Sequence, residues 1–191
     1  MIDGSDILVS VCAAVDDRRR DDAAAILSNE YPCMPLKNAG RHYSAIQSMR
    51  VFSRDGFIDR YTGKRLVFPG TLRLLSKFFP VEFPFHSNWK TDECHFAFWE
   101  LSPTIDHVVP LSRGGADHED NWVSTSMVRN AAKANFTIEE LGWQLLPSGD
   151  LSQWDGLTHW FLRQIERQHD LASFAYLRMW TEAAKLTIGC P

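Results

Sequence analysis

The chain has 191 residues, of which 45% are hydrophobic and 12% aromatic, and its formal net charge is −4. A chain of this size and composition buries a sizeable core, which excludes an intrinsically disordered protein. The negative net charge disfavours a wholly basic nucleic-acid-binding protein. None of its cysteines forms a C-x-x-C pair, so neither a disulfide framework nor a zinc knuckle is indicated.

The N-terminal region is predicted to be helical. Apolar residues between Leu8 and Leu27 recur with the helical period, and Pro32 and Pro35 end the pattern. A run of aspartates and arginines over 16–22 is typical of a solvated helix face. The alternative for this run is a basic arm, whose field the flanking aspartates would largely cancel.

No membrane segment is expected near the start of the chain. The early apolar stretch from Ile7 to Val15 contains Ser10 and is too short to span a bilayer, and no basic region precedes it. We therefore expect a protein that does not associate with membranes and that is located in the cytoplasm.

The middle of the chain alternates helices with short extended segments. Ser44 is a candidate N-cap for a helix over 44–54, and 54–64 predicts a hairpin or knuckle. Pro69 opens a further helix. The expected elements after it are strands over 95–101, 104–109 and 121–125, a glycine loop over 112–116 and a helix over 126–135.

The C-terminal part is again predicted to be helical. Thr137 and Glu140 form a capping-box pattern for a short helix that Gly142 ends. Two apolar stripes with helical spacing follow, and we expect them to pack in the core. They consist of Leu157, Trp160, Phe161 and Ile165, and of Phe174, Leu177, Trp180 and Ala184.

The residues that carry chemistry lie between 104 and 135. Asp106 and His107 are adjacent at the end of a predicted strand, where side chains point to opposite faces unless a bend or bulge turns one of them. Asn121 opens the next strand, and Asn130 lies on the helix after it. Carboxylate and amide oxygens suit a divalent cation, and a neutral histidine can take a proton from water near pH 7.

This stretch resembles the HNH endonuclease family. The resemblance rests on Asp-His-x-x-Pro-Leu-Ser-x-Gly-Gly, then Asn-Trp, then Asn-x-x-Lys-x-Asn, all within 104–135. It implies an α+β protein with a ββα-metal core. The nuclease domain would span 41–143, with an insertion at about 64–103. The resemblance does not clearly cover the two ends, for which the apolar spacing predicts an N-terminal helical region over 1–40 and a C-terminal helical region over 144–191.

The resemblance also implies a role for each signature residue. His107, Asn121 and Asn130 occupy the three signature positions, which makes the chain an H-N-N variant. His107 would be the general base, and Asn121 would hold the loop that orients it. Asp106 and Asn130 would bind the metal, and two oxygen ligands favour Mg²⁺ or Mn²⁺ over a tight zinc site.

Two basic residues near the motif are candidate phosphate contacts. Lys133 follows Asn130 by about one helical turn, and Arg113 lies in the glycine loop. We expect each either to contact nucleic acid or to be an ordinary solvated surface charge.

Many HNH proteins hold a structural zinc on two C-x-x-C pairs. The matching positions here are Asp59, Thr62, Ser126 and Arg129, so we predict no structural zinc. Asp59 and Arg129 would either form an ion pair across the vacated site or both face solvent. The insertion would serve as a packing layer in place of the zinc, or it would contact a nucleic-acid backbone and stack bases.

The leading hypothesis is a metal-dependent HNH endonuclease that hydrolyses phosphodiester bonds of DNA with a histidine base and one divalent cation. The alternatives are an RNA-directed or toxin-like HNH nuclease, and a catalytically silent nucleic-acid-binding module. Because the chain has no net positive charge, stable binding to nucleic acid could involve a protein partner or a homo-oligomer, although neither is required.

Overall fold

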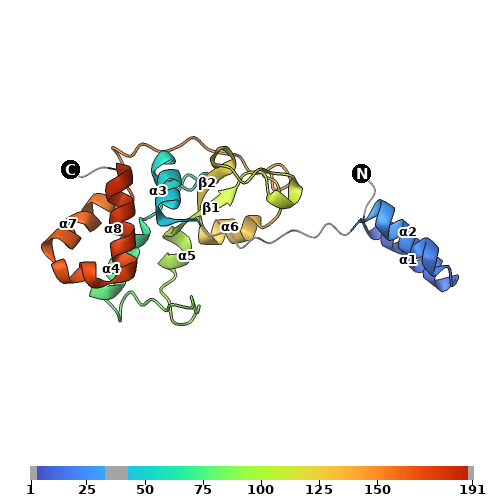
Figure 1. Cartoon of the computed structure of the whole chain (residues 1–191), viewed down its shortest axis with the longest axis horizontal. Coiled ribbons are helices and arrows are strands. Elements are labelled where there is room, and N and C mark those ends of the chain that lie inside the picture. The colour runs from blue at the N-terminus through green and yellow to red at the C-terminus, as the bar shows by residue number, and fades with distance from the viewer. Residues whose placement is uncertain (1–3, 33–42, 189–191) are drawn as a thin grey trace. The chain divides into compact units, whose positions relative to one another are not determined.

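The computed structural model describes residues 4–32 and 43–188 (Figure 1). The contacts divide the chain into two units, Met1–Arg41 and His42–Pro191. The described residues contain eight α-helices and one antiparallel sheet of two strands, so the protein belongs to the α+β class. Within these residues, no helix has both the length and the apolar character needed to cross a membrane.

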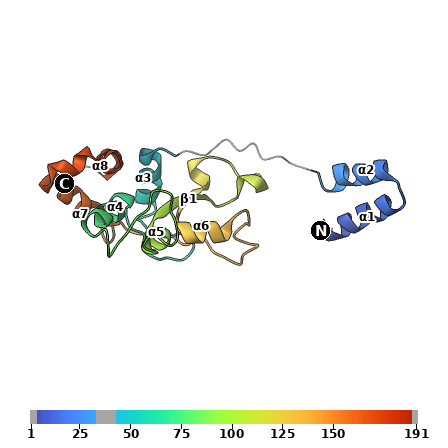
Figure 2. The ribbon, with the colours of Figure 1, turned by 90° about the horizontal axis from the view of Figure 1, so that it is seen from below.

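The described part of the first unit is a hairpin of two helices, which confirms the helical character predicted for this region. Helix α1 (Gly4–Asp16) and helix α2 (Arg20–Glu30) pack side by side (Figures 1 and 2). Their connection, residues 17–19, lies within the charged run over 16–22, and the Arg19 guanidinium contacts the carboxylates of Asp17 and Asp22 at 2.9 and 3.0 Å. The run is solvated as expected, and it spans the end of α1, the turn and the first residues of α2. Helix α2 ends before Pro32, and Pro35 lies outside the described residues.

Four helices of the second unit build its main core. They are α3 (Ala45–Arg54), α4 (Pro69–Phe78), α7 (Thr158–Arg167) and α8 (Ala175–Ile188). Figure 1 shows α4, α7 and α8 together at one end of this unit. Phe68 lies at their centre, with its ring edge-on to the rings of Phe161 and Trp180 at centroid distances of 5.1 and 5.4 Å. Most of the two predicted C-terminal stripes is therefore core, although Leu157 and Phe174 stay exposed.

Local sequence signals set the starts of these helices. Ser44 caps α3 in a capping box with Gln47, which confirms the predicted N-cap. Pro69 is in the first turn of α4, where its missing N–H costs no helical hydrogen bond. The reciprocal hydrogen bonds of the box at Thr137 and Glu140 also form, at 2.9 and 3.3 Å. They close a turn rather than the predicted short helix.

The predicted strand over 95–101 is wrong, because helix α5 (Ala97–Leu101) occupies most of it. Ala97 and Phe98 are neighbours and both are buried. A strand would turn them to opposite faces, whereas a helix presents both to one interior. Phe98 packs against Phe83, Phe85 and Trp89 of the preceding segment. These aromatic side chains form a packing layer, which was one of the two alternatives for the insertion.

The remaining elements form a continuous strand–loop–strand–helix segment. Strand β1 (Pro103–His107) pairs with β2 (Trp122–Ser126), and helix α6 (Met127–Lys133) begins at the next residue. Ser126 is both the last residue of β2 and the N-cap of α6, where its Oγ accepts a hydrogen bond from the Arg129 N–H at 3.2 Å. The predicted strands over 104–109 and 121–125 and the helix over 126–135 are confirmed to within a few residues.

A buried carboxylate joins this segment to α3. Asp55 follows α3 and is fully buried. Its Oδ1 accepts hydrogen bonds from Arg54 and Arg60 at 3.0 and 2.8 Å, and its Oδ2 accepts one from the Ser124 N–H at 2.7 Å. Because a buried charge is tolerated only with such partners, Asp55 fixes β2 against the end of α3.

Candidate active site

The β1–β2 register places His107 opposite Trp122. Facing residues of an antiparallel pair present their side chains on the same face, and the His107 Nε2 and Trp122 Nε1 atoms are 3.0 Å apart. Both nitrogens also approach Asp117 Oδ1, at 2.8 and 3.1 Å. The Trp122 Nε1–H donates to Asp117 Oδ1, and to His107 Nε2 in the tautomer that leaves this nitrogen without a hydrogen. In the other tautomer His107 Nε2 donates to Asp117 Oδ1, and Nδ1 is the nitrogen that can take a proton.

Asp106 lies on the opposite face of β1 and pairs with Lys133. The Lys133 Nζ donates to Asp106 Oδ2 at 3.0 Å and to the His107 carbonyl oxygen at 2.7 Å, and the lysine side chain is 0% exposed. The Tyr61 hydroxyl donates to the same Asp106 oxygen at 2.6 Å. Burial, reinforced by the charge of Asp106, raises the pKa of Tyr61 far above its ordinary value, so this hydroxyl stays protonated and continues to donate.

Asn130 ties α6 to the middle of β1. Its Nδ2 donates to the Thr104 Oγ1 at 3.0 Å and to the Ile105 carbonyl oxygen at 3.2 Å. Asn130 and Lys133 lie three residues apart on α6, which places them on one face of the helix. That face covers the side of β1 that carries Asp106.

The Asn121 side chain closes the loop between the strands. Its Oδ1 accepts a hydrogen bond from the Val109 N–H at 2.9 Å, and its Nδ2 donates to the carbonyl oxygens of Val109 and Ala116, both at 2.8 Å. Gly115 makes this tight closure possible, because a Cβ atom there would lie 1.9 Å from the Val109 carbonyl oxygen. The amide thus spans the loop that follows His107.

The structure brings some of the expected site residues together and separates others. Asp106 and Asn130 lie on the α6 side of β1, together with Lys133. His107 belongs to the other side, because β1 pairs regularly through Asp106 and His107 and shows no bulge that would turn one side chain. Asn121 lies in the loop beyond the end of β1.

The two candidate phosphate contacts have partners within the chain. Lys133 is inside the protein and neutralises Asp106, whereas a phosphate contact requires an exposed ammonium group. Arg113 is half-exposed, and its guanidinium lies 3.2 Å from the Glu140 carboxylate. A phosphate that contacts Arg113 therefore competes with Glu140.

Sequence reasoning missed Asp117 and Tyr61. Asp117 reaches His107 only because the glycine loop folds back, and no spacing rule marks such a loop residue. Tyr61 lies 45 positions from Asp106 and meets it through the knuckle. The contact of Trp122 with His107 could have been predicted. Pairing the two predicted strands as a hairpin, with a register shift of one residue, places Trp122 opposite His107.

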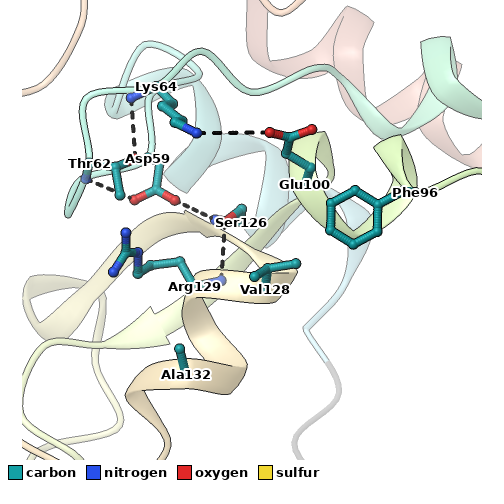
Figure 3. Close-up of a pocket in the computed structure, with 9 residues that line it drawn as sticks. All are labelled: Asp59, Thr62, Lys64, Phe96, Glu100, Ser126, Val128, Arg129 and Ala132. Carbon is teal, nitrogen blue, oxygen red and sulfur yellow. Dashed lines mark hydrogen bonds and ion pairs between the residues drawn. The ribbon is translucent and has the colours of Figure 1, made fainter.

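The four positions that match zinc ligands in the resemblance all line one pocket (Figure 3). The pocket has a volume of about 320 Å³, and Asp59 lies buried in its wall. Asp59 Oδ1 accepts hydrogen bonds from the backbone N–H groups of Tyr61 and Thr62, at 3.0 and 3.2 Å. Its Oδ2 accepts from the Thr125 hydroxyl and the Ser126 N–H, at 3.1 and 3.0 Å. One carboxylate thereby joins the knuckle to the junction of β2 and α6.

Asp59 does not pair with Arg129, and it does not face solvent either. All its hydrogen bonds come from uncharged groups, while the Arg129 guanidinium lies over the Trp143 ring, 4.4 Å from its centroid. The predicted ion pair with Arg129 and the predicted exposure to solvent are therefore both wrong for Asp59. Four neutral donors satisfy a carboxylate without a partner of opposite charge.

Two oxygen atoms on the α6 side of β1 could accept a divalent cation. Asp106 uses Oδ2 for Lys133 and Tyr61, and its Oδ1 accepts no hydrogen bond from the described residues. Asn130 donates through Nδ2, which leaves its Oδ1 as an acceptor. Mg²⁺ binds to proteins through one or two such oxygens and keeps several waters. Among the described residues, no three His, Cys, Asp or Glu side chains cluster as a metal cage.

Asp59→Ala should destabilise the protein strongly. The substitution leaves the buried Ser126 N–H and Thr125 hydroxyl without an acceptor, and we expect a loss of about 3 kcal/mol or more in the free energy of unfolding. Urea unfolding measures this loss. The matched control is Asp92→Ala, which removes an exposed carboxylate and should change stability by less than about 0.5 kcal/mol. Equal effects of the two substitutions would contradict a structural role for Asp59.

Purified protein should contain no stoichiometric zinc, and a chelator should leave its Tm nearly unchanged. The reason is that the four positions matching zinc ligands hold Asp59, Thr62, Ser126 and Arg129, which offer no sulfur. Elemental analysis together with thermal unfolding tests this expectation. One tightly bound zinc per chain, with a lower Tm after its removal, would show that it is wrong.

We compared the chain with protein-family models, with curated proteins and with solved structures. None of the three comparisons found a match.

Proposed function

We propose that the chain is a metal-dependent endonuclease of the HNH type that hydrolyses phosphodiester bonds of DNA. The observation that carries the proposal is the strand–loop–strand–helix segment over 103–133. In this segment α6 returns Asn130 and Lys133 to β1, and Asn121 spans the loop after His107. The resemblance within 104–135 supplies the reaction class.

In the proposed reaction, His107 Nδ1 takes a proton from a water molecule. The resulting hydroxide attacks phosphorus and the bond from phosphorus to the 3′ oxygen breaks. The leaving 3′ oxygen takes a proton from solvent water, and the products carry 5′-phosphate and 3′-hydroxyl ends. Asp117 holds Nε2–H, orients the ring and stabilises the imidazolium that forms. The His107 side chain is only 5% exposed, whereas the Asp117 side chain that contacts it is half-exposed.

A divalent cation would supply charge stabilisation on the phosphate at this site. Asp106 Oδ1 and Asn130 Oδ1 would hold it. Lys133 holds the Asp106 carboxylate through its Oδ2. Tyr61 holds the same carboxylate from the knuckle.

One observation favours a second candidate, a nucleic-acid-binding module without activity. Lys133 already neutralises Asp106, and Asp106 and His107 occupy opposite faces of β1. In this second candidate the pair of Asp106 and Lys133 would stabilise the fold and perform no chemistry. The two candidates differ in whether His107 and the metal are needed for cleavage.

His107→Ala should reduce cleavage by roughly 10²–10⁴-fold, the usual contribution of a positioned base. The substrates are supercoiled plasmid, linear duplex, single-stranded DNA and RNA, each with Mg²⁺ or with a chelator. Asp117→Asn should lower kcat less than His107→Ala and shift its pH profile, because it weakens the hydrogen bond to Nε2.

The matched control is His169→Ala, which removes an exposed histidine outside the segment. It should cleave like the unmodified chain. Full activity of the His107 variant would remove that residue from the mechanism. DNA binding without cleavage by the unmodified chain would favour the silent module, and preference for RNA would favour an RNA-directed nuclease.

Asp106→Asn should abolish Mn²⁺ binding in titration calorimetry. It also leaves the Lys133 ammonium group buried without a counter-ion, so stability should fall by about 3–5 kcal/mol. The double variant Asp106→Asn, Lys133→Met removes both charges together. It should recover most of the stability and still not bind Mn²⁺. Unchanged Mn²⁺ affinity in this folded double variant would contradict a metal site at Asp106.

A further inference from the structure

Two cations on helix α4 have aromatic partners and no acidic one. Arg73 and Lys77 lie four residues apart, so they project from the same face of the helix. The Arg73 guanidinium carbon lies 3.6 Å from the ring centroid of Phe85 and 4.7 Å from that of Tyr176. The Lys77 Nζ lies 3.3 Å from the centroid of Phe174. Within residues 4–32 and 43–188, neither cation forms an ion pair.

The aromatic partners attract the positive charge of Arg73 but do not satisfy its donors. An aromatic ring offers no oxygen acceptor to the five N–H groups of a guanidinium. Burial lowers the pKa of Arg73, and Tyr176 and Cys94 oppose this shift, whereas no carboxylate among the described residues does. Arginine nevertheless stays charged at any pH at which a protein is folded. A partly buried cation without a counter-ion favours an anion from outside the chain.

Both cations line one small pocket between α4 and the start of α8. It has a volume of about 150 Å³, and its other lining residues are Phe174, Ala175, Tyr176 and Leu177. None of these residues is acidic. The nearest acidic residues along the chain, Glu82 and Asp170, neither line the pocket nor pair with Arg73 or Lys77. The first turn of α8 adds the positive end of its helix dipole to the field of the two side chains.

The chemistry of the pocket selects a phosphate group. A guanidinium beside an ammonium group offers several charged donors to the oxygens of one phosphate. Cationic and aromatic side chains together are typical of surfaces that bind nucleic acid. In both views α4, α5 and α6 follow one another along the second unit, and α5 contacts α6 (Figures 1 and 2). A nucleic acid that reaches α6 and extends along α5 therefore approaches α4.

We propose that Arg73 and Lys77 bind a backbone phosphate of the nucleic acid at a point outside the cleavage site. The inference rests on the proposed function, because it takes nucleic acid to be the substrate. Such a contact positions the substrate without reading its sequence. The two alternatives for the insertion then coexist on α4, since the aromatic packing layer also holds a cation that contacts the backbone.

The salt dependence of DNA binding tests this contact. The double variant Arg73→Met, Lys77→Met removes both charges and keeps unbranched apolar side chains against the rings. Binding of the full chain to a short fluorescent duplex is measured in chelator, which prevents metal-dependent cleavage. Loss of one phosphate contact should reduce the slope of log K against log salt by about 0.9. It should also weaken binding roughly tenfold at about 0.1 M salt, equally for two unrelated sequences.

Two single variants control for folding and for net charge. Lys77 is exposed, so Lys77→Met should weaken binding in the same direction without a change in Tm. The matched control is Lys90→Met, which removes the same charge from the same insertion, where the ammonium group already pairs with Glu93. Its slope should equal that of the unmodified chain. An unchanged slope in the double variant, or an equal decrease in the Lys90 variant, would overturn the proposal.

Further measurements separate this contact from the nuclease activity. With Mg²⁺, the double variant should raise KM and keep kcat, whereas His107→Ala lowers kcat. If the unmodified chain binds DNA without cleaving it, the proposed nuclease fails and the slopes still decide the phosphate contact. If the chain binds no DNA, and inorganic phosphate raises its Tm only while Arg73 and Lys77 are present, the pocket takes a free phosphate. That result would overturn the contact with nucleic acid.

Discussion

The ion pair between Lys133 and Asp106 is the contact on which the candidate site depends. A fully buried ammonium group is tolerated only when its charge and its hydrogen-bond donors find partners. Asp106 Oδ2 and the His107 carbonyl oxygen supply those partners. Both belong to the end of β1, so the electrostatic requirement of one lysine fixes the position of α6 over the two residues of greatest chemical interest.

Two further carboxylates organise the surroundings of this pair. Asp55 holds Arg54, Arg60 and the backbone of β2, while Asp59 holds the knuckle and the start of α6. They differ in chemistry, since Asp55 has guanidinium partners and Asp59 has only neutral donors. In the resemblance to HNH proteins, Asp59 stands where a cysteine would bind zinc. The hydrogen bonds of its carboxylate join the same two parts of the chain that a shared metal would join.

Much of the fold could be predicted from local signals. The cap at Ser44, the strands on either side of the glycine loop and the helix after Ser126 depend on residues close in sequence, and each is found. The strand expected over 95–101 failed because a short aromatic run does not reveal its period, and Ala97 and Phe98 pack as parts of a helix.

The candidate site was predictable in its residues but not in its contacts. The spacing of Asn130 and Lys133 indicated a shared helix face, yet spacing does not say whether a lysine points outward. The burial of Lys133 follows from the acceptor that β1 offers at its end. The contacts of Asp117 and Tyr61 depend on how a loop and a knuckle fold back, which is tertiary information.

The absence of any residue between β2 and α6 has a mechanical consequence. Because Ser126 belongs to the strand, caps the helix and donates its N–H to Asp59, the junction has no flexible hinge. When strand β2 tilts, helix α6 tilts with it as part of one rigid body, so Asn130 and Lys133 move together with the strand. Opening motions at this end of the sheet are thus expected to be concerted, with strand, helix and knuckle gaining or losing order in one step.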